Sequence, residues 1–392
     1  MSAPVVLWPN IGAEEGSARH DRAEPWMVAV AGLWRRLFAA GTAWVDGTGM
    51  PAVAGAAAEA RAAFAWLEAD GALTAWLNDA SARECADAAG RRLTGAPVAA
   101  VERVHDKAFA FEAARDEGLL PADLVATVAV LDPDRLRDPD AGVAEIQRVL
   151  DGWPDWARRR FTLKPRFGSS GRGRAAGRDG RADDPALRRA LPRLAERGGA
   201  MLEPWLDRCE DLSASLWLAE SGELHLLGTS EQVLAESGLY RGQRGTVDSK
   251  GRVTSGSERD EELRGAAVAI AVRAARAGFC GPCGLDAFAY RAPSGAAVFR
   301  PVVEWNARFT LGSVVIGLVK RAHAEIRAAF SPGPEQRLAF QFALDAPKGG
   351  WPESNAALRV LRYADRDAVV QPALAIARDR ATLDAQLGLD RD

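Results

Sequence analysis

The chain has 392 residues, of which 48% are apolar and 26% are charged, and its formal net charge is −3. This length leaves room for two or three domains, and the composition is typical of a soluble globular protein. The small acidic excess argues against a general nucleic-acid binder, which would carry a basic face. Because the chain has neither a bilayer-length apolar run nor a secretory leader, we expect a cytoplasmic protein without a nucleic-acid or membrane partner.

Cysteine, histidine and lysine are scarce. Four cysteines are too few for a disulfide scaffold, and the four histidines lack metal-ligand spacing, which argues against zinc. Only five of the 50 basic residues are lysine, so arginine serves almost everywhere that a surface cation is needed. Lysine and arginine are not equivalent at a phosphate. Lys107 and Lys164 therefore call for a chemical explanation, with chance as the alternative.

The first hundred residues alternate strands with helices. We expect strands over 5–8 and 42–45 and helices over 26–39, 52–67 and 81–93, the last capped by Ser81. This alternation predicts a small, mostly parallel α/β domain.

The middle of the chain mixes both kinds of element. A helix begins at Asp106, and further helices are predicted over 141–150, 185–197, 260–277 and 311–329. Strands are predicted over 125–130, 161–163, 200–203, 212–218, 224–229, 285–291 and 297–304. We expect the basic stretch up to Asp184 to be mobile and residues 232–256 to be irregular. Residues after about 330 read as an appendage with two strands and a final helix.

A glycine-rich segment follows the strand over 161–163. Lys164 ends the strand, and Gly168, Ser169, Ser170, Gly171 and Gly173 come directly after it. Glycine lets successive N–H groups approach an anion, and lysine supplies the point charge that a polyphosphate needs. The segment is therefore either a phosphate-covering loop or a solvent-exposed linker. It is no Walker A loop, because the lysine precedes the glycines.

Oxygen-bearing side chains lie on the two strands over 285–291 and 297–304. Asp286 interrupts the first strand, Glu304 ends the second, and Asn306 follows two residues later. Such ligands suit Mg²⁺, and Arg308 adds a forked cation for a phosphoryl or carboxylate group. The alternative is a set of surface carboxylates paired with arginines.

Glu203, Trp205 and Leu206 follow another strand and could form a hinge for an adenine edge, with Glu210 near the ribose. For Trp205 alone, core packing is the simpler interpretation. Cys280 and Cys283 have the spacing of a redox motif, but they follow a helix instead of preceding one, so we interpret them as a turn.

In this order the motifs resemble the ATP-grasp superfamily of carboxylate–amine ligases, which includes D-alanine–D-alanine ligase. The resemblance covers residues 106–312. It implies that Lys107, Lys164 and Gly168–Gly171 bind the phosphates of ATP, that the segment from Glu203 to Glu210 holds adenine and ribose, and that Asp286, Glu304 and Asn306 hold Mg²⁺ or Mn²⁺. Lys164 and Arg308 would act on the reacting groups.

The implied fold has a Rossmann-like domain over 1–104, two α+β ATP-grasp lobes over 105–202 and 203–329, and a C-terminal extension over 330–392. The implied reaction forms an amide or peptide bond through an acyl phosphate and releases ADP and phosphate. The family often forms homodimers. One departure is Gly284, where the D-alanine ligases carry an oxyanion-stabilising arginine, and Arg308 is the candidate replacement.

Two other functions remain open. A small-molecule kinase would share the nucleotide site but would form ADP without free phosphate, and a non-catalytic protein would bind nucleotide without turnover. The substrates are not readable from the sequence. Guesses for the acceptor pocket are Trp8, Asn10, Asn78, Arg241 and Arg244.

Overall fold

The computed structural model describes residues 6–13, 24–38, 43–45, 51–53, 72–168, 173–235, 240–347, 349–365 and 367–388. Contacts divide the chain into two compact units. Unit 1 comprises residues 1–102, 212–285 and 306–392, and unit 2 comprises residues 103–211 and 286–305. Among the helices that the structure describes, none is both long and apolar enough to cross a membrane.

Unit 1 begins with a small sheet of order β3-β2-β1-β4, in which β1 pairs in parallel with both β2 and β4. The elements are β1 (Val6–Trp8), α1 (Pro25–Arg35), β2 (Ala43–Val45), β3 (Pro51–Val53), β4 (Leu73–Ala75) and α2 (Ala80–Ala88). The parallel pairing of β1 with β2 and β4, and the helix α1 between β1 and β2, are consistent with the predicted Rossmann-like start, whereas β3 pairs antiparallel with β2. The helix predicted over 52–67 overlaps β3 at its first residues, and the rest of it lies outside the described residues.

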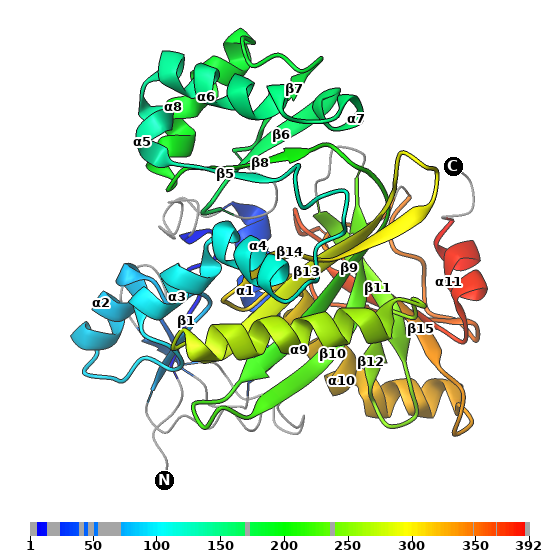
Figure 1. Ribbon diagram of the computed structural model, residues 1–392. Coiled ribbons are helices and arrows are strands. Elements are labelled where there is room, and N and C mark those ends of the chain that lie inside the picture. The colour runs from blue at the N-terminus through cyan, green and yellow to red at the C-terminus, as the bar shows by residue number, and fades with distance from the viewer. Residues whose placement is uncertain are drawn as a thin grey trace. The chain divides into compact units, whose positions relative to one another are not determined.

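A large sheet has the strand order β14-β13-β9-β10-β11-β15-β17-β16, with β12 beside β11 (Figure 1). Its strands are β9 (Asp207–Leu218), β10 (Leu224–Leu234), β11 (Tyr240–Val247), β12 (Val253–Thr254), β13 (Gly281–Arg291), β14 (Ala297–Asn306), β15 (Leu338–Ala343), β16 (Leu358–Arg362) and β17 (Ala373–Ala377). The helices of this region are α9 (Asp260–Arg276), α10 (Leu311–Phe330) and α11 (Arg380–Leu387).

This sheet corrects two expectations. The described part of residues 232–256 is not irregular, because β11 pairs with β10 over 240–244 and with β15 over 242–247. Residues after 330 continue the same sheet, since β15 pairs with β11 and β17 with β15. The four-part domain division stays a prediction.

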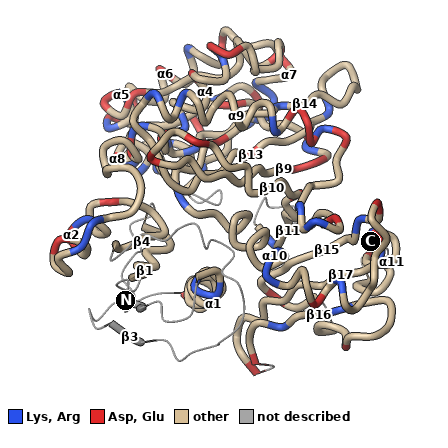
Figure 2. The backbone as a smooth tube through the Cα atoms, turned by 90° about the horizontal axis from the view of Figure 1, so that it is seen from below, with Lys and Arg blue, Asp and Glu red and all other residues tan. Residues whose placement is uncertain are grey.

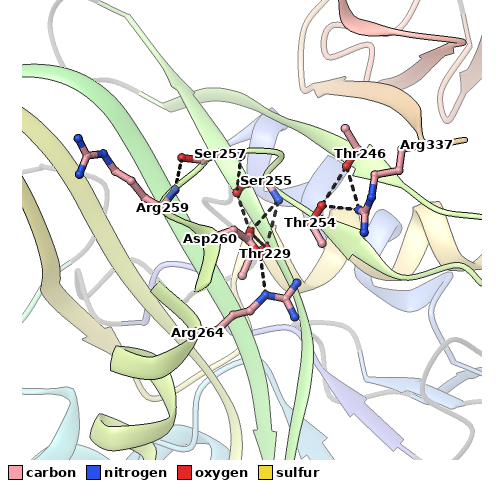
Figure 3. Close-up of polar contacts among 9 residues, drawn as sticks. All are labelled: Thr229, Thr246, Thr254, Ser255, Ser257, Arg259, Asp260, Arg264 and Arg337. Carbon is pink, nitrogen blue, oxygen red and sulfur yellow. Dashed lines mark hydrogen bonds and ion pairs between the residues drawn. The ribbon is translucent and has the colours of Figure 1, made fainter. Parts of the chain in front are cut away.

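The start of α9 is tied to the sheet by a polar network (Figure 3). The Asp260 carboxylate accepts hydrogen bonds from Thr229, from Ser255 Oγ at 2.7 Å and from Arg264 Nε at 2.5 Å. Burial alone would raise the pKa of Asp260, but these hydrogen bonds outweigh burial and lower it. The network therefore anchors the first turn of α9 on β10.

Unit 2 contains a four-stranded antiparallel sheet of order β5-β8-β6-β7. Its elements are β5 (Ala129–Leu131), α5 (Pro133–Arg137), α6 (Pro139–Asp151), α7 (Asp155–Arg158), β6 (Arg160–Pro165), β7 (Ala175–Arg178), α8 (Pro185–Glu196) and β8 (Ala200–Pro204). Before them come α3 (Val98–His105), which begins in unit 1, and α4 (Lys107–Asp116). The stretch expected to be mobile thus contains β7, which pairs with β6.

The two faces of this sheet have different environments. Phe161, Leu163 and Leu202 pack in a core with α5, α6 and α8, which lie together on one side of the sheet (Figure 1). Successive strand residues point to opposite faces, so Lys164, Met201 and Glu203 point the other way. Met201 packs there with Phe111, Phe288 and Tyr290.

Basic and acidic positions are interspersed along the described chain, as in α2 (Figure 2).

Candidate functional site

The candidate site is built on the second face of the unit 2 sheet. In the β6–β8 pairing Lys164 lies opposite Met201, and Glu203 is its diagonal neighbour on the same face. Lys164 Nζ is 2.7 Å from Glu203 Oε2. Burial, reinforced by the cations of Arg300 and Arg208, lowers the pKa of Lys164 against the opposing pull of Glu203.

A buried arginine completes this pair. Arg300, on β14, is 2% exposed, and its Nη2 and Nη1 lie 3.0 Å and 3.3 Å from Glu203 Oε1 and Oε2. Its Nε donates to the Val302 carbonyl at 3.2 Å. Burial alone would raise the pKa of Glu203, but Arg300 and Lys164 outweigh burial and hold that pKa far below its usual range.

Lys107 is the first residue of α4, which Asp106 caps by accepting a hydrogen bond from Ala108 N at 2.9 Å. Lys107 Nζ donates to the Gly168 carbonyl at 2.6 Å and lies 3.2 Å from Glu304 Oε1. Arg166 forms an ion pair with Asp106, which joins the end of β6 to the cap. Lys107 therefore contacts the segment that runs from Lys164 to Gly168, and Lys164 is the first residue of that segment.

The glycine-rich segment is described at its two ends. Gly168 and Gly173 have φ of 145° and 73°, and a Cβ on Gly173 would lie 2.7 Å from Arg197 Nη1. Both positions therefore need the freedom of glycine. Ser169, Ser170 and Gly171 lie outside the described residues.

Asp286 and Glu304 lie on neighbouring strands of unit 2. The Arg300 guanidinium lies 5.7 Å from the Phe288 ring centre, so these two residues share a face of β13 and β14. Asp286 is two residues from Phe288 and Glu304 is four residues from Arg300. Strand alternation therefore directs both carboxylates to that same face.

Carboxylate oxygens such as those of Asp286 and Glu304 are preferred protein ligands of a hard divalent cation such as Mg²⁺ or Mn²⁺. The Lys107 ammonium beside Glu304 indicates that this carboxylate already faces positive charge. Among the described residues no group of three or more His, Cys, Asp or Glu side chains could hold a metal. The predicted set has only two carboxylates, so it would need Asn306 and further oxygens from a bound phosphate.

The predicted hinge has unexpected contacts. The backbone N–H of Trp205 donates to the Arg160 carbonyl at 2.8 Å. The Arg174 and Arg160 guanidinium groups lie 4.6 Å and 5.3 Å from the centre of the Trp205 ring. Leu206 packs against the core that contains Met201, and Glu210 is half-buried on β9. Trp205 is therefore half-buried, with its ring covered in part by two arginines.

Asn306 and Arg308 belong to unit 1, so their predicted roles stay predictions. Arg308 Nη1 donates to the Phe309 carbonyl at 2.9 Å. Gly284 has little room for a side chain, since a Cβ there would lie 3.0 Å from Thr310 Cγ2 and 3.3 Å from the Ala214 carbonyl oxygen. A side chain at position 284 would therefore require these two neighbours to shift.

The guessed acceptor residues Asn10 and Asn78 have structural contacts. Asn10 Nδ2 donates to the Leu77 carbonyl at 2.7 Å, and Asn78 Nδ2 donates to the Thr94 carbonyl at 2.8 Å. Another guess, Arg244, forms an ion pair with Glu231 on the adjacent strand. Trp8 and Arg241 lie on β1 and β11, and their role in the acceptor pocket stays a prediction.

The cysteine pair differs in one respect from its prediction as a turn, because Cys283 lies inside β13. Burial raises the pKa of both the Cys280 and the Cys283 thiols. Thiols shifted in this direction are poor nucleophiles at neutral pH.

Sequence reasoning missed Arg300. The available signal was an arginine inside the apolar first part of β14, between Phe299 and Pro301. In a chain that uses arginine for most of its cations, one more arginine did not stand out.

No known family profile matches the chain, and no curated protein matches it. Solved structures do. N5-carboxyaminoimidazole ribonucleotide synthetase from Thermus thermophilus is 19% identical with a TM-score of 0.52, over 98% of this chain and 96% of that chain.

Two further structures are similar. Rhizobium etli pyruvate carboxylase is 15% identical with a TM-score of 0.57, over 99% of this chain and 37% of that chain. The biotin carboxylase domain of Hydrogenobacter thermophilus 2-oxoglutarate carboxylase was solved with MgADP and bicarbonate. It is 14% identical with a TM-score of 0.50, over 79% of this chain and 70% of that chain. The D-alanine ligase-like subtype is not among these neighbours and stays a prediction. The sheet topology and these neighbours together show that the chain has the ATP-grasp fold.

Proposed function

We propose that this protein is an ATP- and Mg²⁺-dependent ligase that joins a carboxylate to an amine through an acyl phosphate and releases ADP and phosphate. The observation that supports the proposal most is the hydrogen bond from the Lys107 ammonium to the Gly168 carbonyl, at the end of the segment that Lys164 begins. Both ammonium groups are largely buried, with 9% and 17% of their side chains exposed. Buried cations at a glycine turn suit a polyphosphate.

Phosphoryl transfer needs mainly positioning and charge neutralisation. Lys107 and Lys164 would neutralise the nucleotide phosphates, and Gly168–Gly171 would cover them and exclude water from the acyl phosphate. Trp205, Leu206 and Glu210 would hold adenine and ribose. The substrate carboxylate would attack the γ-phosphate, and the amine would then displace phosphate from the acyl phosphate.

Asp286, Glu304 and Asn306 would hold the cation, which would supply charge neutralisation for the nucleotide phosphates. Arg308 would stabilise the transferring phosphoryl group or the oxyanion at the acyl carbon. The neighbour solved with MgADP supports the choice of Mg²⁺, and its bicarbonate makes bicarbonate a carboxylate to test. We further propose a cytoplasmic location, and a homodimer as the assembly to test.

The test measures ADP and free phosphate for pairs of carboxylates, including bicarbonate, with amines. We expect equal amounts of ADP and phosphate that depend on both substrates, and a hydroxamate when hydroxylamine replaces the amine. Glu304→Gln should abolish turnover, whereas Glu196→Gln, an exposed carboxylate at the end of α8, should retain it. ADP without free phosphate would instead indicate a kinase and contradict the ligase proposal.

A further inference from the structure

Three charged side chains are packed together inside unit 2. Arg300, Glu203 and Lys164 have 2%, 5% and 17% of their side chains exposed. Two of them are cations and one is a carboxylate, so the set carries one excess positive charge. Buried charges are costly unless they are paired.

The two oxygens of the Glu203 carboxylate have different contacts with the two cations. Arg300 lies within 3.3 Å of both Glu203 oxygens, whereas Lys164 contacts only Oε2. The guanidinium is itself fixed by the Val302 carbonyl and lies over the Phe288 ring. Glu203 therefore keeps a fixed cationic partner even when the Lys164 ammonium turns elsewhere.

The situation without Arg300 would be different. Lys164 and Glu203 would then form a neutral buried pair, and Lys164 would have to leave that pair to contact a phosphate. Its departure would leave the Glu203 carboxylate buried without a cationic partner, which is strongly unfavourable. Phosphate binding by Lys164 would be weakened by that cost.

We propose that Arg300 is a positioning residue: by holding Glu203, it leaves the charge of Lys164 available for the polyphosphate of a bound nucleotide. This inference rests on the proposed nucleotide site. Arg300 itself need not touch the nucleotide. It acts through Glu203 on Lys164.

The test is a charge-restoration experiment. Arg300→Met removes the excess charge of the buried set, and adding Glu203→Gln restores it, because Lys164 is then the only charged member. Calorimetry of MgATP binding to the wild type, to Arg300→Met and to the double variant compares the three states. Far-ultraviolet circular dichroism verifies that each variant is folded.

We expect Arg300→Met to weaken MgATP binding by about tenfold to a hundredfold, as for other lost contacts to a buried charge. The double variant should regain most of the wild-type affinity, although it carries one more substitution. A residue that only packs the core would give the opposite pattern, with the second substitution adding to the loss or leaving it unchanged.

Arg300→Lys is the second variant, for use if Arg300→Met does not fold. It keeps the charge but cannot bond both carboxylate oxygens. We expect it to lose less than about fivefold in MgATP affinity. A loss above a hundredfold in this variant would overturn the inference, as would wild-type affinity in Arg300→Met.

The proposed nucleotide site fails in a distinguishable way. Without that site the wild type itself would not bind MgATP. If the wild type binds MgATP but the charge-restoring variant stays weak, the nucleotide site stands and only the role of Arg300 falls.

Discussion

Glu203 is held ionised in the interior by two cations from different strands. Its carboxylate accepts from Lys164 on β6 and from Arg300 on β14. Removing one partner from a buried ion pair is much more damaging than removing an exposed charge, because it leaves the remaining charges unpaired. This single side chain is therefore important for the stability of unit 2.

We predict that Glu203→Gln lowers the free energy of unfolding by about 3–5 kcal/mol at pH 7, because Arg300 and Lys164 would face each other as unpaired buried cations. Urea unfolding followed by circular dichroism measures the change. Glu196→Gln is the matched control, and this exposed substitution should stay within about 0.5 kcal/mol of the wild type. Equal stability of the two variants would contradict the burial of an ionised Glu203.

The same pair of cations predicts a pH dependence. The pKa of Glu203 is lowered in the folded state, so the unfolded chain binds a proton at this carboxylate before the folded chain does. The stability from Glu203 is fully present above the unfolded pKa of about 4.3 and is lost as the pH falls from there toward the folded pKa. The stability gap between the wild type and Glu203→Gln should therefore narrow below about pH 4. A gap that widened on acidification would contradict this sign.

At the residue scale, the sequence indicated Lys107 and Lys164 as candidate phosphate-binding residues, because lysine is rare in this chain. The partners of these lysines were harder to predict. The Glu203–Lys164 contact depends on the β6–β8 register, and the Arg300–Glu203 contact joins residues 97 positions apart. Neither distance is encoded in a local pattern.

At the scale of elements, helix caps show both a correct and an incorrect prediction. The helix predicted to begin at Asp106 is α4, and Asp106 is its N-cap. The helix predicted from Ser81 instead begins at Ala80, and its cap is Asp79, which accepts from Ala82 N at 2.8 Å. Ser81 Oγ donates to that same carboxylate at 2.8 Å.

We predict that Asp79→Ala destabilises the protein by about 1–2 kcal/mol, since it removes a cap and also a partner of Asn10. Ser81→Ala should cost less than about 0.5 kcal/mol. The midpoints of urea unfolding measure both changes. A larger loss for Ser81→Ala than for Asp79→Ala would restore Ser81 as the cap.

Three of the strands that the sequence did not predict share a physical reason. β7, β11 and β12 carry many small or polar residues, and their short sequences lack the apolar alternation that predicts a strand. Their backbones are ordered by neighbours: β6 pairs with β7, and β10 and β15 both pair with β11. Strand formation here follows from tertiary pairing, which outweighs local propensity.

At the scale of the whole molecule, the C-terminal residues belong structurally to the sheet of unit 1. Phe340 and Phe342 on β15 are fully buried, and β15 covers the edge of β11. An uncovered edge with exposed apolar residues favours aggregation.

We therefore predict that deleting residues 331–392 yields insoluble or largely unfolded protein. Solubility after expression and circular dichroism of any soluble fraction measure the outcome. A truncated chain that stayed soluble, folded and as stable as the full chain would show that these residues form a dispensable appendage.

The fold itself was predictable because several motifs occur in a fixed order along the chain. The first lysine, the second lysine with its glycines, the Glu203 segment and the Asp286–Asn306 set were enough to indicate the ATP-grasp fold, and the structure confirms that fold. The substrates were not predictable, because the residues that would contact them follow no comparable pattern.

The most direct test of the nucleotide site is calorimetric titration of MgATP into the wild type, Lys164→Met and Lys250→Met. Lys250 is an exposed lysine of unit 1 and serves as the matched control. We predict saturable binding by the wild type and by Lys250→Met, and at least about tenfold weaker binding by Lys164→Met, because a buried charged partner of the phosphates is lost. No binding by the wild type, or equal binding by all three proteins, would contradict a nucleotide site built around Lys164.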